Sequence, residues 1–128
     1  MKKILITLSI ALSLGLIWVA LSTNGEPATQ SSDVVRVENG TQYIRIVARG
    51  GYSPKQISAT ANMLTVLEIE TKGTYDCSAA LTIPKLGYSQ FLPPTGVTKI
   101  EVPKNLATNS LDVTCSMGMY NSVINFNS

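Results

Sequence analysis

The 128-residue sequence contains no histidine, only two cysteines and few charged residues, which make up 14% of the chain. Without histidine there is no histidine general base, no Ser-His or Cys-His nucleophilic pair and none of the usual zinc enzyme sites. A blue-copper electron-transfer centre is excluded as well, because it needs two histidines beside its cysteine. The sequence also lacks a glycine-rich phosphate loop, so we do not expect an enzyme.

Positive charge is also scarce. Lys2 and Lys3 are two of the ten basic residues, and the other eight are balanced by eight acidic residues. No basic run is interleaved with aromatic residues, so we do not expect nucleic-acid binding.

Long apolar runs are absent except at residues 4–21, directly after Lys2-Lys3. Eighteen residues at about 1.5 Å each just cross a bilayer core of about 30 Å. We therefore interpret residues 1–21 as a transmembrane anchor or uncleaved signal. Cleavage near the small residues Ala20 and Ser22, which would release an exported protein, is the alternative.

Residues 22–32 (STNGEPATQSS) are small and polar, with Gly25 and Pro27, which predicts a flexible linker. This segment has no Lys or Arg, whereas two lysines precede the apolar run. The positive-inside rule therefore predicts a single-pass protein of the cell membrane whose remaining domain lies on the extracytoplasmic face.

Residues 33–128 are short runs of β-branched and aromatic residues separated by turn signals, which predicts one all-β domain. Ile44 alternates with polar residues in one run, and Leu67 and Ile69 do so in another, as in half-buried strands of an antiparallel sheet. Glu68 and Glu70 fall on the solvated face, where we expect surface charge. We expect a Greek-key β-sandwich of seven to eight strands. The expected strands are 34–37, 42–48, 55–60, 64–71, 79–83, 98–102, 111–115 and 122–126.

Sulfur is concentrated near the C-terminus, at Cys115, Met117 and Met119. In extended backbone these three side chains point to one side, because the side-chain period is two. If the strand ends near Cys115, Gly118 lets the loop curl and still bring the sulfurs together. Cys77, in the loop after the strand at 64–71, can supply a second thiolate.

The residues alone leave two interpretations open. Thiolate and thioether ligands without nitrogen or oxygen partners select copper(I), so Cys77, Cys115, Met117 and Met119 form a candidate copper(I) site. Alternatively, Cys77 and Cys115 form a disulfide that joins two sheets of a metal-free binding or structural domain, with the methionines in the core.

Four spaced motifs in residues 42–127 resemble one known family, a cupredoxin-like family. The motifs are Gly51-Tyr52-Ser53-Pro54, Gly73-Thr74-Tyr75-Asp76-Cys77-Ser78, Ile83-Pro84-Lys85-Leu86-Gly87 and Thr114-Cys115-Ser116-Met117-Gly118-Met119. The family includes membrane-anchored copper(I) chaperones of bacterial copper-resistance systems and N-terminal domains of copper-exporting P-type ATPases.

The resemblance implies a cupredoxin sandwich in which Cys77 and Cys115 bind copper(I) most tightly and Met117 and Met119 complete the site. The chaperones can hold a two-copper cluster, so one or two copper(I) ions are expected. It also implies a membrane-anchored chaperone or sequestering protein, with a copper-exporting P-type ATPase or another copper protein as its partner. The best-known chaperones of this type act on cytoplasmic copper. The resemblance therefore implies a cytoplasmic domain, whereas the charges around the apolar run predict an extracytoplasmic one.

Overall fold

The computed structural model describes residues 33–128. These residues form strands and two single turns of 3-10 helix. The expected anchor at residues 1–21 and linker at residues 22–32 lie outside the described part. Between residues 33 and 128, no helix is long and apolar enough to cross a membrane.

The elements follow one another in short succession. The strands are β1 (Val35–Glu38), β2 (Thr41–Ala48), β3 (Tyr52–Ser53), β4 (Gln56–Thr60), β5 (Thr65–Thr71), β6 (Ala80–Ile83), β7 (Tyr88–Phe91), β8 (Gly96–Val102), β9 (Ser110–Cys115) and β10 (Asn121–Asn127). The 3-10 helices are η1 (Cys77–Ala79) and η2 (Pro84–Leu86).

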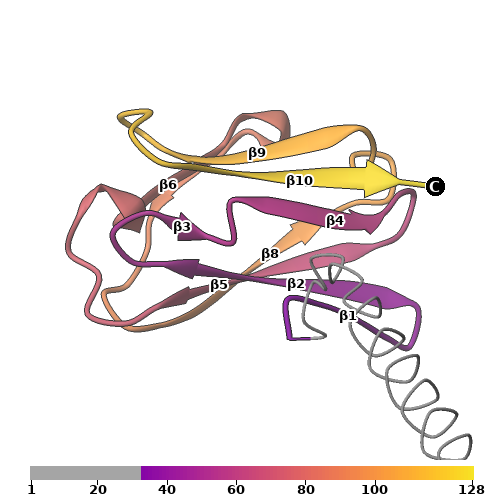
Figure 1. The fold of residues 1–128 in the computed structure, drawn as a ribbon, viewed down its shortest axis with the longest axis horizontal. Coiled ribbons are helices and arrows are strands. Elements are labelled where there is room, and N and C mark those ends of the chain that lie inside the picture. The colour runs from indigo at the N-terminus through magenta and orange to yellow at the C-terminus, as the bar shows by residue number, and fades with distance from the viewer. Residues whose placement is uncertain (1–32) are drawn as a thin grey trace, which may run out of the picture.

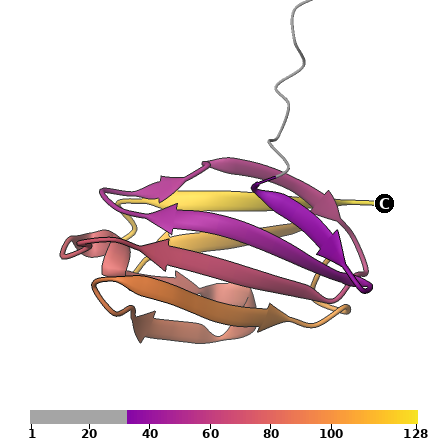
Figure 2. The same cartoon turned by 90° about the horizontal axis from the view of Figure 1, so that it is seen from below.

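Two sheets are stacked face to face (Figures 1 and 2). The first has the order β1-β2-β5-β8, with β3 also paired to β2, and the second has the order β4-β10-β9-β6-β7. This arrangement confirms the all-β, two-sheet sandwich. Both sheets are mixed, because β2 pairs with β5, and β4 with β10, in parallel, whereas β1 with β2 and β5 with β8 are antiparallel.

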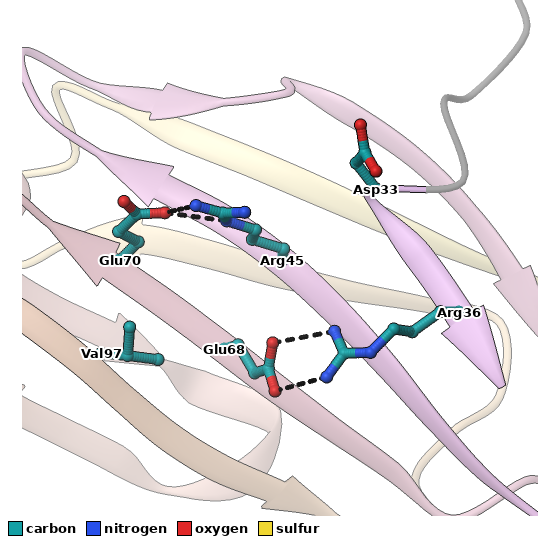
Figure 3. Close-up of a pocket in the computed structure, with 6 residues that line it drawn as sticks. All are labelled: Asp33, Arg36, Arg45, Glu68, Glu70 and Val97. Carbon is teal, nitrogen blue, oxygen red and sulfur yellow. Dashed lines mark hydrogen bonds and ion pairs between the residues drawn. The ribbon is translucent and has the colours of Figure 1, made fainter. Parts of the chain in front are cut away.

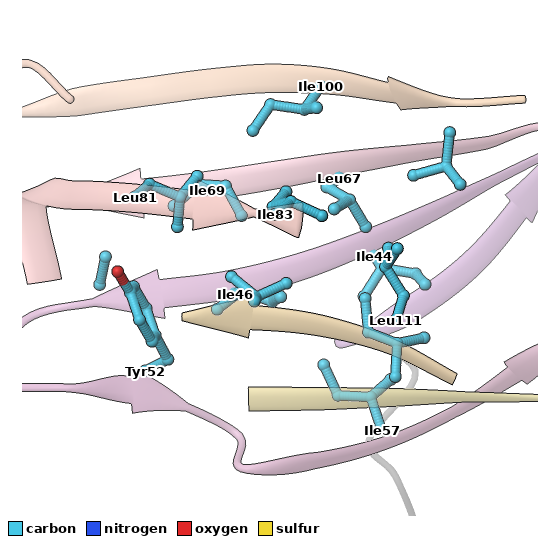
Figure 4. Close-up of a cluster of buried hydrophobic side chains, with 14 of the residues drawn as sticks. Ile44, Ile46, Tyr52, Ile57, Leu67, Ile69, Leu81, Ile83, Ile100 and Leu111 are labelled. Atoms are coloured by element: carbon cyan, nitrogen blue, oxygen red, sulfur yellow. The ribbon is translucent and has the colours of Figure 1, made fainter. Parts of the chain in front are cut away.

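The core lies between the sheets and is built from the alternation seen in the sequence (Figure 4). Ile44 on β2 is in register with Leu67 on β5, and Ile46 with Ile69; all four are fully buried. Leu111 on β9 is also fully buried within the same cluster. Burying an aliphatic side chain contributes about 1.5–3 kcal/mol, so this alternation stabilises the sandwich and fixes its register.

The sequence analysis missed two of the ten strands, because neither carries an apolar alternation. β3 is only two residues long, and β7 is an edge strand of half-buried and exposed residues. Both are nevertheless hydrogen-bonded to a longer neighbour, β3 to β2 and β7 to β6.

The outward face of the first sheet is charged but internally paired (Figure 3). Arg36 donates two hydrogen bonds to the carboxylate of Glu68, at 3.0 and 2.9 Å, and Arg45 forms an ion pair with Glu70. The guanidinium of Arg36 also lies 4.6 Å from the ring centre of Tyr43. The two glutamates therefore act as structural partners of the arginines on neighbouring strands.

Candidate metal centre

The candidate residues lie at one end of the sandwich, where the β9–β10 turn approaches η1 (left end of Figure 1). Pairing of β6 with β9 places Leu81 opposite Cys115, and the amide of Ser116 donates to the carbonyl of Ala80 at 2.8 Å. Since η1 immediately precedes β6, this register brings Cys77 to Cys115 although 37 residues separate them in the sequence.

Cys115 is the last residue of β9 and is buried. The chain then turns sharply, because the amide of Gly118 donates to the carbonyl of Cys115 at 2.9 Å. Gly118 has φ +72°, a left-handed conformation that glycine adopts without steric cost. The turn aims the amide of Met119 at Cys115 Sγ, at 3.2 Å. Of the two geometries considered from the sequence, the structure has the curled loop.

Cys77 opens η1 and is half-buried. Asp76 caps this turn, because its carboxylate accepts hydrogen bonds from the amide and the hydroxyl of Ser78. The desolvation of the Asp76 carboxyl would raise its pKa, but these hydrogen bonds lower it below its usual value. On the inner side, the buried hydroxyl of Tyr52 donates to the carbonyl of Ser78 at 3.0 Å. The Cys77 backbone is thus held from both sides.

The two cysteines are free thiols that interact with each other. The hydrogen bond with Cys115, and then desolvation, raise the pKa of Cys77. Desolvation would also raise the pKa of Cys115, but hydrogen bonds from the Cys77 thiol and from backbone amides, including that of Met119, lower it. The arrangement therefore favours a thiolate at Cys115 that accepts a hydrogen bond from a protonated Cys77.

Met117 and Met119 approach the cysteines through their backbone, while their side chains face solvent. They are 76% and 67% exposed. The expectation that they fill the core, which belonged to the disulfide alternative, is therefore wrong. Two exposed thioether side chains therefore follow the buried Cys115 thiol along one turn.

The donor set fits a soft ion better than a hard one. Within residues 33–128, no group of three or more His, Cys, Asp or Glu side chains is arranged to hold a metal ion. Two cysteines fall short of the four ligands of a structural zinc site. Thiolate with thioether is the donor combination that copper(I) prefers.

Comparison with known proteins identifies the family of this two-sheet sandwich. A family model described as a cupredoxin-like domain matches residues 10–124. The chain belongs to the family of cupredoxin-like domains. No curated protein sequence matches this cupredoxin-like chain.

Two solved structures have the same fold as this cupredoxin-like domain. One is the solution structure of a copper-binding protein in its apo form, with 22% identity and a TM-score of 0.65, covering 73% of this chain and 94% of that one. The other is the metal-binding domain of the copper(I)-exporting P-type ATPase CopA from Streptococcus pneumoniae D39, with copper(I) bound. It has 20% identity and a TM-score of 0.62, and covers 73% of this chain and 93% of that one.

Sequence reasoning missed the residues that position the cysteines. Tyr52 and Asp76 occur in motifs that carried the family resemblance, but no role was assigned to either. Asp76, two residues before a serine, is a recognisable side-chain cap for a following turn. Tyr52 gives no such local signal, because its hydroxyl bonds to the backbone of Ser78, 26 residues away.

Proposed function

We propose that this cupredoxin-like domain binds copper(I) through Cys77, Cys115, Met117 and Met119. The observation that carries the proposal is a pair of interacting free thiols beside two exposed methionines at one end of the sandwich. Copper(I) accepts two to four sulfur ligands and no nitrogen or oxygen ligand is needed. One or two ions fit this number of donors.

The four sulfurs would have different roles. Cys115 is buried at the end of a strand and Cys77 is held by a capped turn, so the thiolates would retain the ion. The thioethers of Met117 and Met119 face solvent and would form the outer, more labile side of the site. Copper(I) would then leave by ligand exchange across the methionine edge.

In the cell, such a domain would act as a chaperone or sequestering protein in copper homeostasis and resistance rather than as an enzyme. Residues 1–21 would anchor it in the membrane as a single span, with the domain extracytoplasmic by the charge rule. The similarity in fold to a copper(I)-exporting ATPase domain supports a copper exporter, or another copper protein, as its partner.

The test is an anaerobic copper(I) titration of the reduced full chain, in an uncharged detergent, against a colorimetric copper(I) chelator. We expect tight uptake of one or two equivalents. Losing a group that merely orients a ligand costs about 10- to 100-fold in metal affinity, so Cys77→Ala or Cys115→Ala should cost more than about 100-fold. Met117→Leu or Met119→Leu should cost about tenfold or less.

Met63→Leu is the matched control, because Met63 lies in the turn before β5 and outside the proposed site. Its copper(I) affinity should equal that of the unmodified chain. If the double variant Cys77→Ala/Cys115→Ala still bound copper(I) as tightly as the unmodified chain, the site assignment would be wrong. Absence of free thiols in protein taken from its native compartment would instead favour the metal-free domain with a Cys77–Cys115 disulfide.

A further inference from the structure

We propose that the end of the sandwich bearing the sulfur site is a docking surface for a second copper-binding protein that presents acidic side chains around its own metal ligands. This inference rests on the proposed function and names the class of partner. Three observations carry it: unpaired cations, a cleft beside Met119, and an exposed apolar centre.

The cations are Arg49, Lys55 and Lys72, which lie in the loops that follow β2, β3 and β5 at this end. All three are exposed, and no carboxylate of residues 33–128 lies within ion-pair distance of them. Arg36 and Arg45, by contrast, are paired on the outer face of the first sheet. Lys99 and Lys104 are also exposed and form no ion pair with any carboxylate that the structure describes, but they lie on and beyond β8 and not in the loops that carry Arg49, Lys55 and Lys72.

In the described part of the chain, the acid nearest to the cysteines forms no ion pair with these cations. Asp76 is the acid nearest to the cysteines, and its carboxylate is taken up by the amide and hydroxyl of Ser78. These hydrogen bonds do not remove the charge of Asp76, but Arg49, Lys55 and Lys72 outnumber this carboxylate. The local charge is therefore positive, although the whole chain carries a formal net charge of only +2. A neighbouring acidic surface would be attracted by this end specifically.

A cleft of about 220 Å³ connects the cations to the sulfur site. Its lining includes Arg49, Lys55, Met119 and Tyr120. Gly51 lies against Tyr120 in this lining, since a Cβ on Gly51 would be 3.5 Å from the Tyr120 ring. A carboxylate side chain of a partner can enter this cleft, meet both cations and bring its neighbouring ligands next to Met119.

The centre of the surface is apolar. Tyr75 and Phe91 are each 84% exposed. Tyr75 directly precedes Asp76, the cap of η1, and Phe91 shares a hollow with Ser116, the residue before Met117. Exposed aromatic and methionine side chains at the centre of a patch, with charges at its rim, are the composition of protein–protein interfaces. This composition favours a protein partner over a small anion.

Transfer across such an interface needs no redox step. Each copper–sulfur bond to this chain that breaks is replaced by a bond to a thiolate of the acceptor, and copper stays in the +1 state. A proton lost by an acceptor thiol is taken up by the released cysteine thiolate or by water. The cations serve to align the two sites and to speed the encounter.

The experiment uses two synthetic acceptor peptides with the same Cys-Gly-Gly-Cys core, flanked either by glutamates or by lysines. Transfer of copper(I) from the loaded full chain, in an uncharged detergent, is followed by stopped-flow absorption. Electrostatic steering raises association rates by about 10- to 1000-fold, so at about 20 mM salt the acidic peptide should react at least about tenfold faster than the basic one. At about 0.5 M salt the difference should largely disappear.

Arg49→Gln/Lys55→Gln should remove most of this preference while leaving the equilibrium copper(I) affinity unchanged. The matched control is Lys99→Gln/Lys104→Gln, which removes the same charge from exposed sites on and beyond β8 and should keep the preference. Equal rates for the two peptides, or equal losses in the two double variants, would overturn the docking surface.

A small amount of anionic lipid in the micelles should leave the preference intact. If it abolished the preference, the cations would face a membrane surface instead and the proposal would be wrong. A chain that takes up no copper(I) in the preceding titration would refute the proposed function itself. Normal uptake without a peptide preference would refute only the docking surface.

Discussion

Tyr52 connects the hydrophobic core to the sulfur site, and replacing it with phenylalanine tests that connection. The side chain is 3% exposed, and its hydroxyl donates to the carbonyl of Ser78, the residue after Cys77. Burial, and then the nearby Cys115, Cys77 and Asp76 charges, raise the pKa of Tyr52, so the phenol stays protonated and keeps donating. Tyr52→Phe removes only this donor.

The size of the effect follows from the burial of the acceptor. Ser78 is fully buried, so its carbonyl cannot exchange the lost hydrogen bond for one with bulk water. Leaving such a group unsatisfied costs about 1–3 kcal/mol. For a domain of 60–100 residues each kcal/mol lowers Tm by about 4–8 °C, so a loss of about 1–3 kcal/mol corresponds to about 4–24 °C.

Tyr52→Phe should also weaken copper(I) binding, because the Ser78 carbonyl belongs to the turn that positions Cys77. Losing a group that orients a ligand costs about tenfold or more in affinity. Thermal unfolding by circular dichroism measures the first effect, and chelator competition on the same preparation measures the second.

Tyr88→Phe is the control, since Tyr88 is half-buried on β7 and its hydroxyl has no hydrogen-bond partner in the described part of the chain. It should change stability by less than about 0.5 kcal/mol. An unchanged Tm for Tyr52→Phe would refute the buried hydrogen bond. A lower Tm with unchanged copper(I) affinity would show that Tyr52 stabilises the fold without positioning Cys77.

Two further changes test the ion pair and the methionine turn. The hydrogen bonds from Arg36 hold the pKa of Glu68 below its usual 4.5, so their stabilisation is full above that pH and is lost as pH falls through the folded-state pKa. Glu68→Gln should therefore reduce the loss of unfolding free energy between pH 7 and about pH 3 in urea titrations, and an identical pH profile would contradict this. Gly118→Ala should destabilise by about 1–2 kcal/mol through its positive φ alone, since a Cβ there meets nothing within 4 Å. Gly118→Asn, which tolerates that φ better, should lose less in the same thermal measurement, and equal losses would point to another cause.

The clearest strand predictions are those whose burial alternates. On β2 and β5, Ile44, Ile46, Leu67 and Ile69 point inward while their polar neighbours point outward, and this period of two is visible without any knowledge of pairing. β7 has no buried residue, and only its half-buried Tyr88 packs against the core, so no alternation marks this edge strand, which is hydrogen-bonded to β6. The parallel pairing of β2 with β5 could not be predicted from the sequence either, because apolar and polar residues alternate in the same way in parallel and antiparallel strands.

The candidate site, too, could be predicted from the sequence only in part. Cys115, Met117 and Met119 are close in sequence, and Gly118 between them signals a turn, so their clustering could be predicted from the chain alone. The approach of Cys77 depends on the pairing of β6 with β9, which no local pattern specifies. The residues therefore left metal site and disulfide equally open, and the family resemblance was needed to favour the metal.

In the proposed site, retention of an ion would be separated from its release because burial falls steeply along one turn. Cys115 is fixed by the end of β9 and by the Met119 amide, whereas two residues further on the Met117 side chain is almost free in solvent. A ligand held by the sheet loses little conformational entropy on binding, and a solvent-exposed one loses more, so the thiolate end should hold copper(I) more tightly than the thioether end. The methionine edge also faces the unpaired cations, so an acidic acceptor would meet the weaker ligands first.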